Sequence, residues 1–99
     1  IFAGIAEGYA GREEAVYFAS DLAAGEVRAL AEAIAQKAAL AAVYSQGSLC
    51  LLGDAGKIKA LSAKLKALGA RGGGKPGSWQ GSAELTEEAL KDLVAQADR

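Results

Sequence analysis

The sequence predicts a small α/β domain in which helices cover a mixed β-sheet, with the element order ββα-ββα-loop-α. Two observations support this class. Segments with helical periodicity alternate with short apolar runs that are rich in β-branched and aromatic residues. The chain also has 99 residues, of which 52% are hydrophobic, which is enough for one core but not for two. Residues 1–99 are therefore expected to form a single domain.

The first half of the chain predicts two strands and a helix. Residues 1–8 (IFAGIAEG) are expected to form an irregular strand, residues 9–14 a turn, and residues 15–20 (AVYFAS) a second strand. A helix is predicted from about Ala24 to Lys37, because its apolar positions recur at the spacing of one helical face. These positions are Val27, Leu30, Ala31, Ile34 and Ala38.

The second half predicts a hairpin and two more helices. Two apolar runs within residues 41–54 flank a central Gln-Gly-Ser, which indicates a hairpin or tightly linked strands. The next helix is expected to end at Gly69, where a left-handed cap favours glycine. Beyond a glycine-rich loop, Thr86 is the expected N-cap of a last helix with an acidic first turn. The apolar stripe of the middle helix consists of Ile58, Leu61, Leu65 and Leu68.

Cysteine and histidine content excludes several kinds of site. The chain has one cysteine, Cys50, and no histidine, so it cannot form an internal disulfide or a zinc site built on these residues. Nucleophilic pairs and triads that need histidine are excluded as well. Cys50 lies in an apolar run, where we expect a small buried residue, which favours a reducing, cytoplasmic setting. We expect no cofactor, no metal and no catalytic activity of this chain on its own.

The chain has no run of about 18 apolar residues, so neither a membrane span nor a membrane partner is expected. It starts at Ile1, contains no methionine, and lacks the basic-then-apolar order of a signal peptide in its first residues. These features indicate a piece excised from a longer protein.

Positive charge is concentrated in one region. The net charge is −1, yet no acidic residue lies between Asp54 and Glu84, which is typical of a phosphate-binding region. The cations of this region are Lys57, Lys59, Lys64, Lys66, Arg71 and Lys75. At about 100° per residue, Lys57 and Lys64 share one flank of the apolar stripe, and Lys59 and Lys66 share the far side. Lys57 and Lys64 are the pair expected to join the glycine-rich loop.

The glycine-rich loop, residues 70–82 (ARGGGKPGSWQGS), is the main candidate site. Its three consecutive glycines can adopt positive φ and can form a concave anion site from their N–H groups. Arg71 and Lys75 flank that site. Trp79 is expected to fill the core, and its alternative role is a stacking face for an unpaired base. The segment matches the P-loop and dinucleotide-binding patterns in form only, because Pro76 replaces the magnesium-binding hydroxyl and no helix follows.

This segment resembles the glycine signature of the DHH-associated domain, on the triple glycine, Lys75-Pro76 and Gln80-Gly81. The wider pattern covers roughly residues 16–82. That domain forms the C-terminus of alanyl-tRNA synthetases and of some free-standing alanyl-tRNA editing proteins, and it also occurs in DHH phosphoesterases. The resemblance implies a non-catalytic domain that contacts alanine-specific tRNA in the service of the catalytic domains of its parent chain. The residues that match the signature are Arg71, Gly72, Gly73, Gly74, Lys75 and Gln80.

Two alternatives stay open. The first is the substrate-clamping domain of a DHH phosphoesterase, although Lys75 stands where that branch usually has histidine. The second is a dimerisation or docking module, a homodimer included, in which Trp79 and the alanine-rich helices bury against a partner. The candidate RNA-binding residues are Arg71, Gly72, Gly73, Gly74, Lys75, Trp79, Gln80, Lys57 and Lys64.

Overall fold

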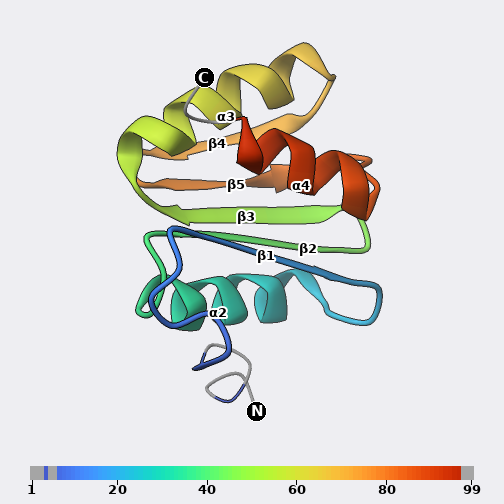
Figure 1. Ribbon diagram of the computed structural model, residues 1–99. Helices are drawn as coiled ribbons and strands as arrows, with labels where there is room; N and C mark the ends of the chain where they lie inside the picture. The colour runs from blue at the N-terminus through green and yellow to red at the C-terminus, as the bar shows by residue number, and fades with distance from the viewer. Residues whose placement is uncertain (1–3, 5–6, 97–99) are drawn as a thin grey trace.

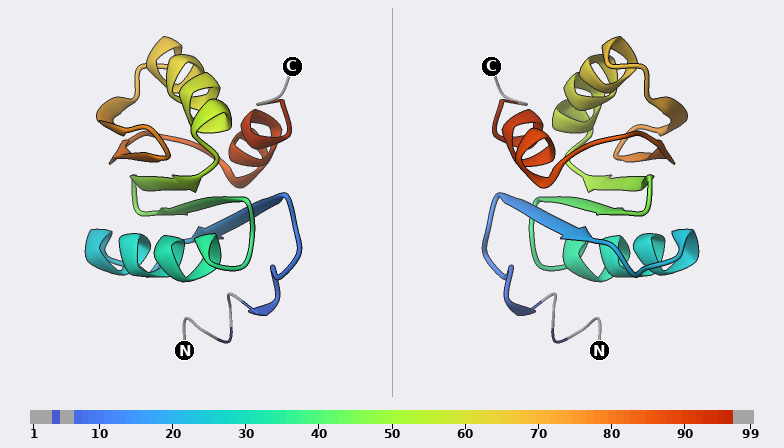
Figure 2. Two further views of the ribbon diagram at one scale, coloured as in Figure 1. Left: turned by 90° about the vertical axis from the view of Figure 1, so that its left-hand side faces the viewer. Right: turned by 90° about the vertical axis from the view of Figure 1, so that its right-hand side faces the viewer.

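The computed structural model describes residue 4 and residues 7–96, and it has three layers. A five-stranded sheet lies between helix α2 (Ala24–Ala35) on one face and helices α3 (Ala55–Ala67) and α4 (Glu87–Ala95) on the other (Figures 1 and 2). The predicted α/β class, a mixed sheet covered by helices, is confirmed. None of the helices in the described residues is long and apolar enough to cross a membrane.

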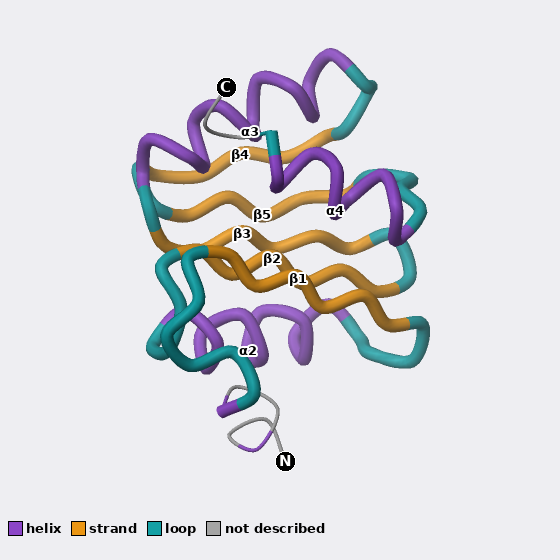
Figure 3. The backbone as a smooth tube through the Cα atoms, viewed as in Figure 1, coloured by secondary structure: helices purple, strands orange, loops and turns teal. Residues whose placement is uncertain are grey.

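The sheet is mixed because only one strand pair is parallel. Its strand order is β1-β2-β3-β5-β4, and β1 pairs with β2 in parallel through a crossover that contains α2, while the other pairs are antiparallel (Figure 3). Strand β4 therefore forms one edge of the sheet. The strands are β1 (Glu14–Ala19), β2 (Leu40–Ser45), β3 (Ser48–Gly53), β4 (Arg71–Lys75) and β5 (Ser78–Ser82).

Alternating side chains of the central strands build two cores, one on each face of the sheet. Leu40 and Leu51 pack with α3 and α4, whereas Val43 and Cys50 pack with α2. The predicted caps are present: the Thr86 hydroxyl accepts a hydrogen bond from the Ala89 N–H at 3.1 Å, and Gly69 follows α3 with a φ of 89°. Helices α3 and α4 are thus each fixed by a buried stripe and a defined end.

Two sequence predictions differ from the structure. Within the predicted first strand, residues 1–3 and 5–6 lie outside the described residues, Gly4 and Glu7 are helical, and residue 8 begins a turn, so no strand forms in its described part. The predicted glycine-rich loop is instead the hairpin of β4 and β5. Its two-residue turn has Pro76 at the first central position and Gly77, with a φ of 83°, at the second, which is the pattern of a type II turn.

Candidate nucleic-acid interface

The triple glycine forms an exposed edge strand and not a concave loop. None of Gly72, Gly73 and Gly74 has a positive φ, so the prediction of an anion site built from left-handed glycines is wrong. The tight turn makes Lys75 and Ser78 a hydrogen-bonded pair, and hydrogen-bonded and non-hydrogen-bonded pairs then alternate along the hairpin. The N–H and C=O groups of Gly72 and Gly74 therefore point to the open edge of the sheet.

The three glycines meet different surroundings. A Cβ atom at Gly72 would lie 2.6 Å from the Cα of Gly81, and one at Gly74 would collide with the carbonyl oxygen of Ser78. A Cβ at Gly73 would meet no atom within 4 Å. Two of the glycines are thus required by the close approach of β4 to β5, and the third is not.

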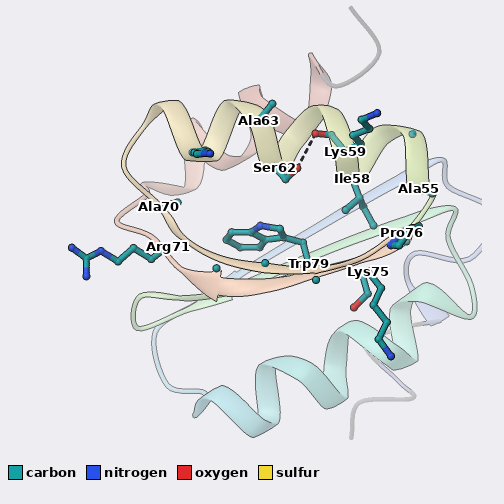
Figure 4. Close-up of a pocket in the computed structure, with 17 residues that line it drawn as sticks. Ala55, Ile58, Lys59, Ser62, Ala63, Ala70, Arg71, Lys75, Pro76 and Trp79 are labelled. Carbon is teal, nitrogen blue, oxygen red and sulfur yellow. Dashed lines mark hydrogen bonds between the residues drawn. The ribbon is translucent and has the colours of Figure 1, made fainter.

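The side of the hairpin that faces α2 carries polar and cationic groups. Arg71 and Lys75 share this side with Ser78 and Gln80, because Trp79 and its register partner Gly74 occupy the opposite side. Figure 4 shows the Lys75 side chain directed toward α2 and the Arg71 side chain projecting past the hairpin. Helix α2 packs on β2 and β3, so this side of the hairpin stays accessible.

Arg28 of α2 joins this group, which sequence reasoning missed. Its Nη1 donates to Ser78 Oγ at 3.3 Å and to Gln80 Oε1 at 3.4 Å, and its Nε lies 3.3 Å from Glu32 Oε1. In the sequence Arg28 is one polar position on the solvent face of a helix, and no local pattern separates it from its neighbours. We call Arg28, Arg71, Lys75, Ser78 and Gln80 the polar face.

The opposite side of the hairpin forms a cavity with α3. Its volume is about 690 Å³, and Lys59, Ser62 and Lys66 of α3 line it together with β4, the turn and Trp79 (Figure 4). The expectation that Lys57 and Lys64 join the glycine segment is wrong, because the hairpin lies beside the other flank of α3. Lys64 Nζ instead donates to the carbonyl oxygen of Gln96 at 2.8 Å.

Trp79 belongs to the core. The residue is 6% exposed and packs in the cluster that contains Leu51, its register partner on β3, and Leu65 of α3. The sequence interpretation of Trp79 as a core residue is therefore confirmed. Because so little of Trp79 is exposed, it offers no open face on which an unpaired base could stack.

Cys50 lies beneath the polar face and is fully buried. Burial raises the pKa of its thiol, and the nearby Arg28 guanidinium opposes this effect only in part. Such a thiol is protonated and inert at neutral pH. Among the described residues, no group of His, Cys, Asp and Glu side chains is arranged to hold a metal ion.

Comparisons of the chain with protein-family models and with curated protein sequences find no match. The similarity to the DHH-associated domain therefore stays a prediction from residues 70–82.

Proposed function

We propose that this chain is a non-catalytic, tRNA-binding accessory domain of a cytoplasmic alanyl-tRNA synthetase or alanyl-tRNA editing protein. The observation that carries the proposal is the accessible hairpin edge: Arg71 and Lys75 bracket a strand without side chains, and Arg28 lies beside it. Backbone groups and cations of this kind bind phosphates without reading base sequence. The specificity for alanine tRNA comes from the family resemblance alone.

The proposed mechanism is positioning. The cations of the polar face neutralise phosphates, and the open N–H groups of Gly72 and Gly74 donate to phosphate oxygens at the edge of β4. The parent chain's other domains then carry out aminoacylation or deacylation on a tRNA held in a fixed orientation.

Titration of this chain with an alanine tRNA transcript at several salt concentrations tests the proposal. If the three cations of the polar face and one lysine of α3 each neutralise a phosphate, about four contacts form. The logarithm of affinity then falls against the logarithm of salt concentration with a slope of roughly −3 to −4. A chain without measurable, salt-dependent tRNA binding would contradict the proposal.

The phosphoesterase alternative keeps one specific observation in its favour. The cavity of about 690 Å³ beside the hairpin has the size of a small-ligand site. Tighter binding of dinucleotides than of folded tRNA would favour that alternative. The docking alternative required Trp79 to bury against a partner, but Trp79 is already buried within the fold and is not free for such a contact.

A further inference from the structure

We propose that an extended acidic segment of a partner polypeptide adds to the sheet as an antiparallel strand along the open edge of β4, with alternate side chains in the cavity beside α3. The inference goes beyond the proposed function and does not depend on it. Both use the backbone groups of Gly72 and Gly74, so the acidic segment and tRNA should compete for this edge.

The open edge of β4 is an unpaired hydrogen-bonding template. All residues of β4 are exposed, and the N–H and C=O groups of Gly72 and Gly74 point away from β5. Among the described residues, no backbone group of a turn or loop bonds to them. At the opposite edge of the sheet, by contrast, the Tyr9 hydroxyl donates to the Val16 carbonyl oxygen of β1 at 3.1 Å. The β4 edge therefore has both the free groups and the space that strand addition requires.

The cavity between β4 and α3 gives room for alternate side chains of the added strand. Partner residues opposite Gly72 and Gly74 point to the same side of the sheet as these glycines, which is the side of the cavity. Figures 1 and 4 show α3 running alongside β4, with the Ile58 side chain directed toward the hairpin. The volume of about 690 Å³ and a lining that includes Ile58, Ala63 and Pro76 favour aliphatic side chains at these two positions.

Cations on both sides of the edge select acidic residues. Away from the cavity, Arg71 and Lys75 stand at the two ends of β4, so the partner residues opposite them lie four positions apart. Opposite charges that face each other across neighbouring strands stabilise the pairing. On the cavity side, Lys59 and Lys66 are exposed, and no acidic residue lines this cavity in the described part of the chain. The edge thus selects acidic residues at positions i and i+4 and aliphatic residues at i+1 and i+3.

The same charges disfavour a second copy of this chain as the occupant. The antiparallel register that pairs all of β4 with β4 of another copy places Arg71 opposite Lys75 at both ends. Like charges that face each other across strands destabilise the pairing, and the glycines between them add no side-chain contact. The occupant is therefore a different polypeptide with the opposite charge.

Isothermal titration calorimetry of the intact chain with a peptide blocked at both ends, Ser-Glu-Val-Thr-Val-Glu-Ser, tests the pairing. Its glutamates should face Arg71 and Lys75, and its valines should face Gly72 and Gly74. We expect saturable binding, and binding at least about tenfold weaker once both valine nitrogens are methylated, because methylation removes main-chain hydrogen bonds.

The matched control peptide is Ser-Val-Glu-Thr-Glu-Val-Ser. It has the same composition and charge, but its glutamates lie too close together to face both Arg71 and Lys75. It should bind about tenfold more weakly than the test peptide. Equal binding of the test, methylated and control peptides would show attraction of charge alone and would overturn the inference.

Amide hydrogen exchange measured by NMR locates the bound peptide. The N–H groups of Gly72 and Gly74 face solvent in the free chain, whereas that of Gly73 faces Gln80 on β5. The peptide should slow exchange at Gly72 and Gly74 by at least about tenfold and leave Gly73 nearly unchanged. Binding without this protection would overturn the inference. Protection that arises without peptide, together with dimerisation, would overturn it in favour of a second copy.

A charge swap tests the two cations. The double variant Arg71→Glu, Lys75→Glu should bind the acidic peptide at least about tenfold more weakly and should gain affinity for the peptide with lysine in place of both glutamates. The control is Lys37→Glu, Lys91→Glu, which changes the net charge equally at residues that pair with Glu7 and Glu87. Equal losses in the two double variants, or no gain for the lysine peptide in a folded charge-swap variant, would overturn the inference.

The outcomes separate this inference from the proposed function. If tRNA binds with the expected salt dependence and the acidic peptide does not bind, the inference is wrong and the proposed function stands. If the peptide binds and tRNA does not, strand addition stands and the proposed function is wrong. If both bind, the peptide should displace tRNA. Simultaneous binding, with Gly72 and Gly74 protected by the peptide, would support strand addition and contradict the tRNA contact at these glycines.

Discussion

Gly72 and Gly81 face each other across β4 and β5 so closely that a Cβ on either would lie 2.6 Å from the Cα of the other. Real Cβ atoms do not approach backbone atoms to this distance, so the pairing of the two strands depends on both glycines. The same approach brings Gly72 to within reach of the Trp79 ring, since its added Cβ would lie 2.9 Å from the Cζ2 atom. The glycine pair therefore sets the position of the edge strand over the core.

The first prediction concerns the unequal roles of the three glycines. Gly72→Ala and Gly74→Ala should each lower the free energy of unfolding by about 1 to 3 kcal/mol, because β4 must move away from β5. Gly73→Ala should stay within about 0.5 kcal/mol of the parent, since its added methyl meets open space. Denaturant unfolding of the three variants measures the difference. Equal destabilisation by all three would show that close packing is not what these glycines provide.

Elements that are determined by nearby residues could be predicted from the sequence, whereas those that depend on distant pairing could not. Helices α2, α3 and α4 were predictable, because an apolar stripe and end residues such as Thr86 and Gly69 act over a few neighbouring positions. Strand β4 was not, because glycine is depleted in strands and three in a row indicate a loop. Its strand form depends on pairing with β5. The approach of Arg28 to Gln80 spans 52 positions and follows from the strand order, for which no local pattern exists.

The second prediction concerns Trp79. Trp79→Ala should lower the free energy of unfolding by about 3 to 5 kcal/mol, because it leaves a large void beneath α3. Such a loss is a large share of the roughly 5 to 15 kcal/mol typical of a domain. Trp79→Phe should cost clearly less. Chemical denaturation followed by circular dichroism measures both, and a fully stable Trp79→Ala would contradict the core assignment.

The third prediction follows from the raised pKa of Cys50. In the unfolded chain the thiol deprotonates near its ordinary value of 9.0, whereas burial keeps it protonated to higher pH in the folded chain. The folded state then binds more protons in this window, so the free energy of unfolding should fall as pH rises from about 8 to about 10, by up to about 1.4 kcal/mol per unit. Cys50→Ala should show a shallower decline. Denaturation at each pH compares the two, and identical pH dependence would exclude a contribution from the thiol.

The fourth prediction concerns Glu32, whose carboxylate lies 3.3 Å from the Arg28 guanidinium at the polar face. Glu32→Gln removes a negative charge from beside the candidate phosphate contacts. We expect tRNA affinity to rise about two- to fivefold at low salt and to return toward that of the parent at high salt. The control is Glu87→Gln, which disrupts the similar pair with Lys91, at 3.0 Å, on α4. A rise of equal size in both variants would indicate a net-charge effect only.

The last prediction separates phosphate contacts from neutral ones on the polar face. Arg28→Ala, Arg71→Ala and Lys75→Ala each remove one cation, so each should flatten the slope of log affinity against log salt by about 1. Gln80→Ala removes a neutral side chain and should leave the slope unchanged whatever it does to affinity. Lys91→Ala, on α4 and paired with Glu87, should change neither.

Folding must be checked for Arg28→Ala, because Arg28 also hydrogen-bonds Ser78 and Gln80. If that variant keeps the parent's circular dichroism and its slope still flattens, the guanidinium acts on the phosphate and not through the hairpin. If all three cation variants bind tRNA with an unchanged salt slope, the RNA interface does not include the polar face. The salt slope could instead flatten in Arg71→Ala and Lys75→Ala but not in Arg28→Ala. That result would confine the RNA interface to the edge strand β4, and it would mean that Glu32 already neutralises the Arg28 guanidinium.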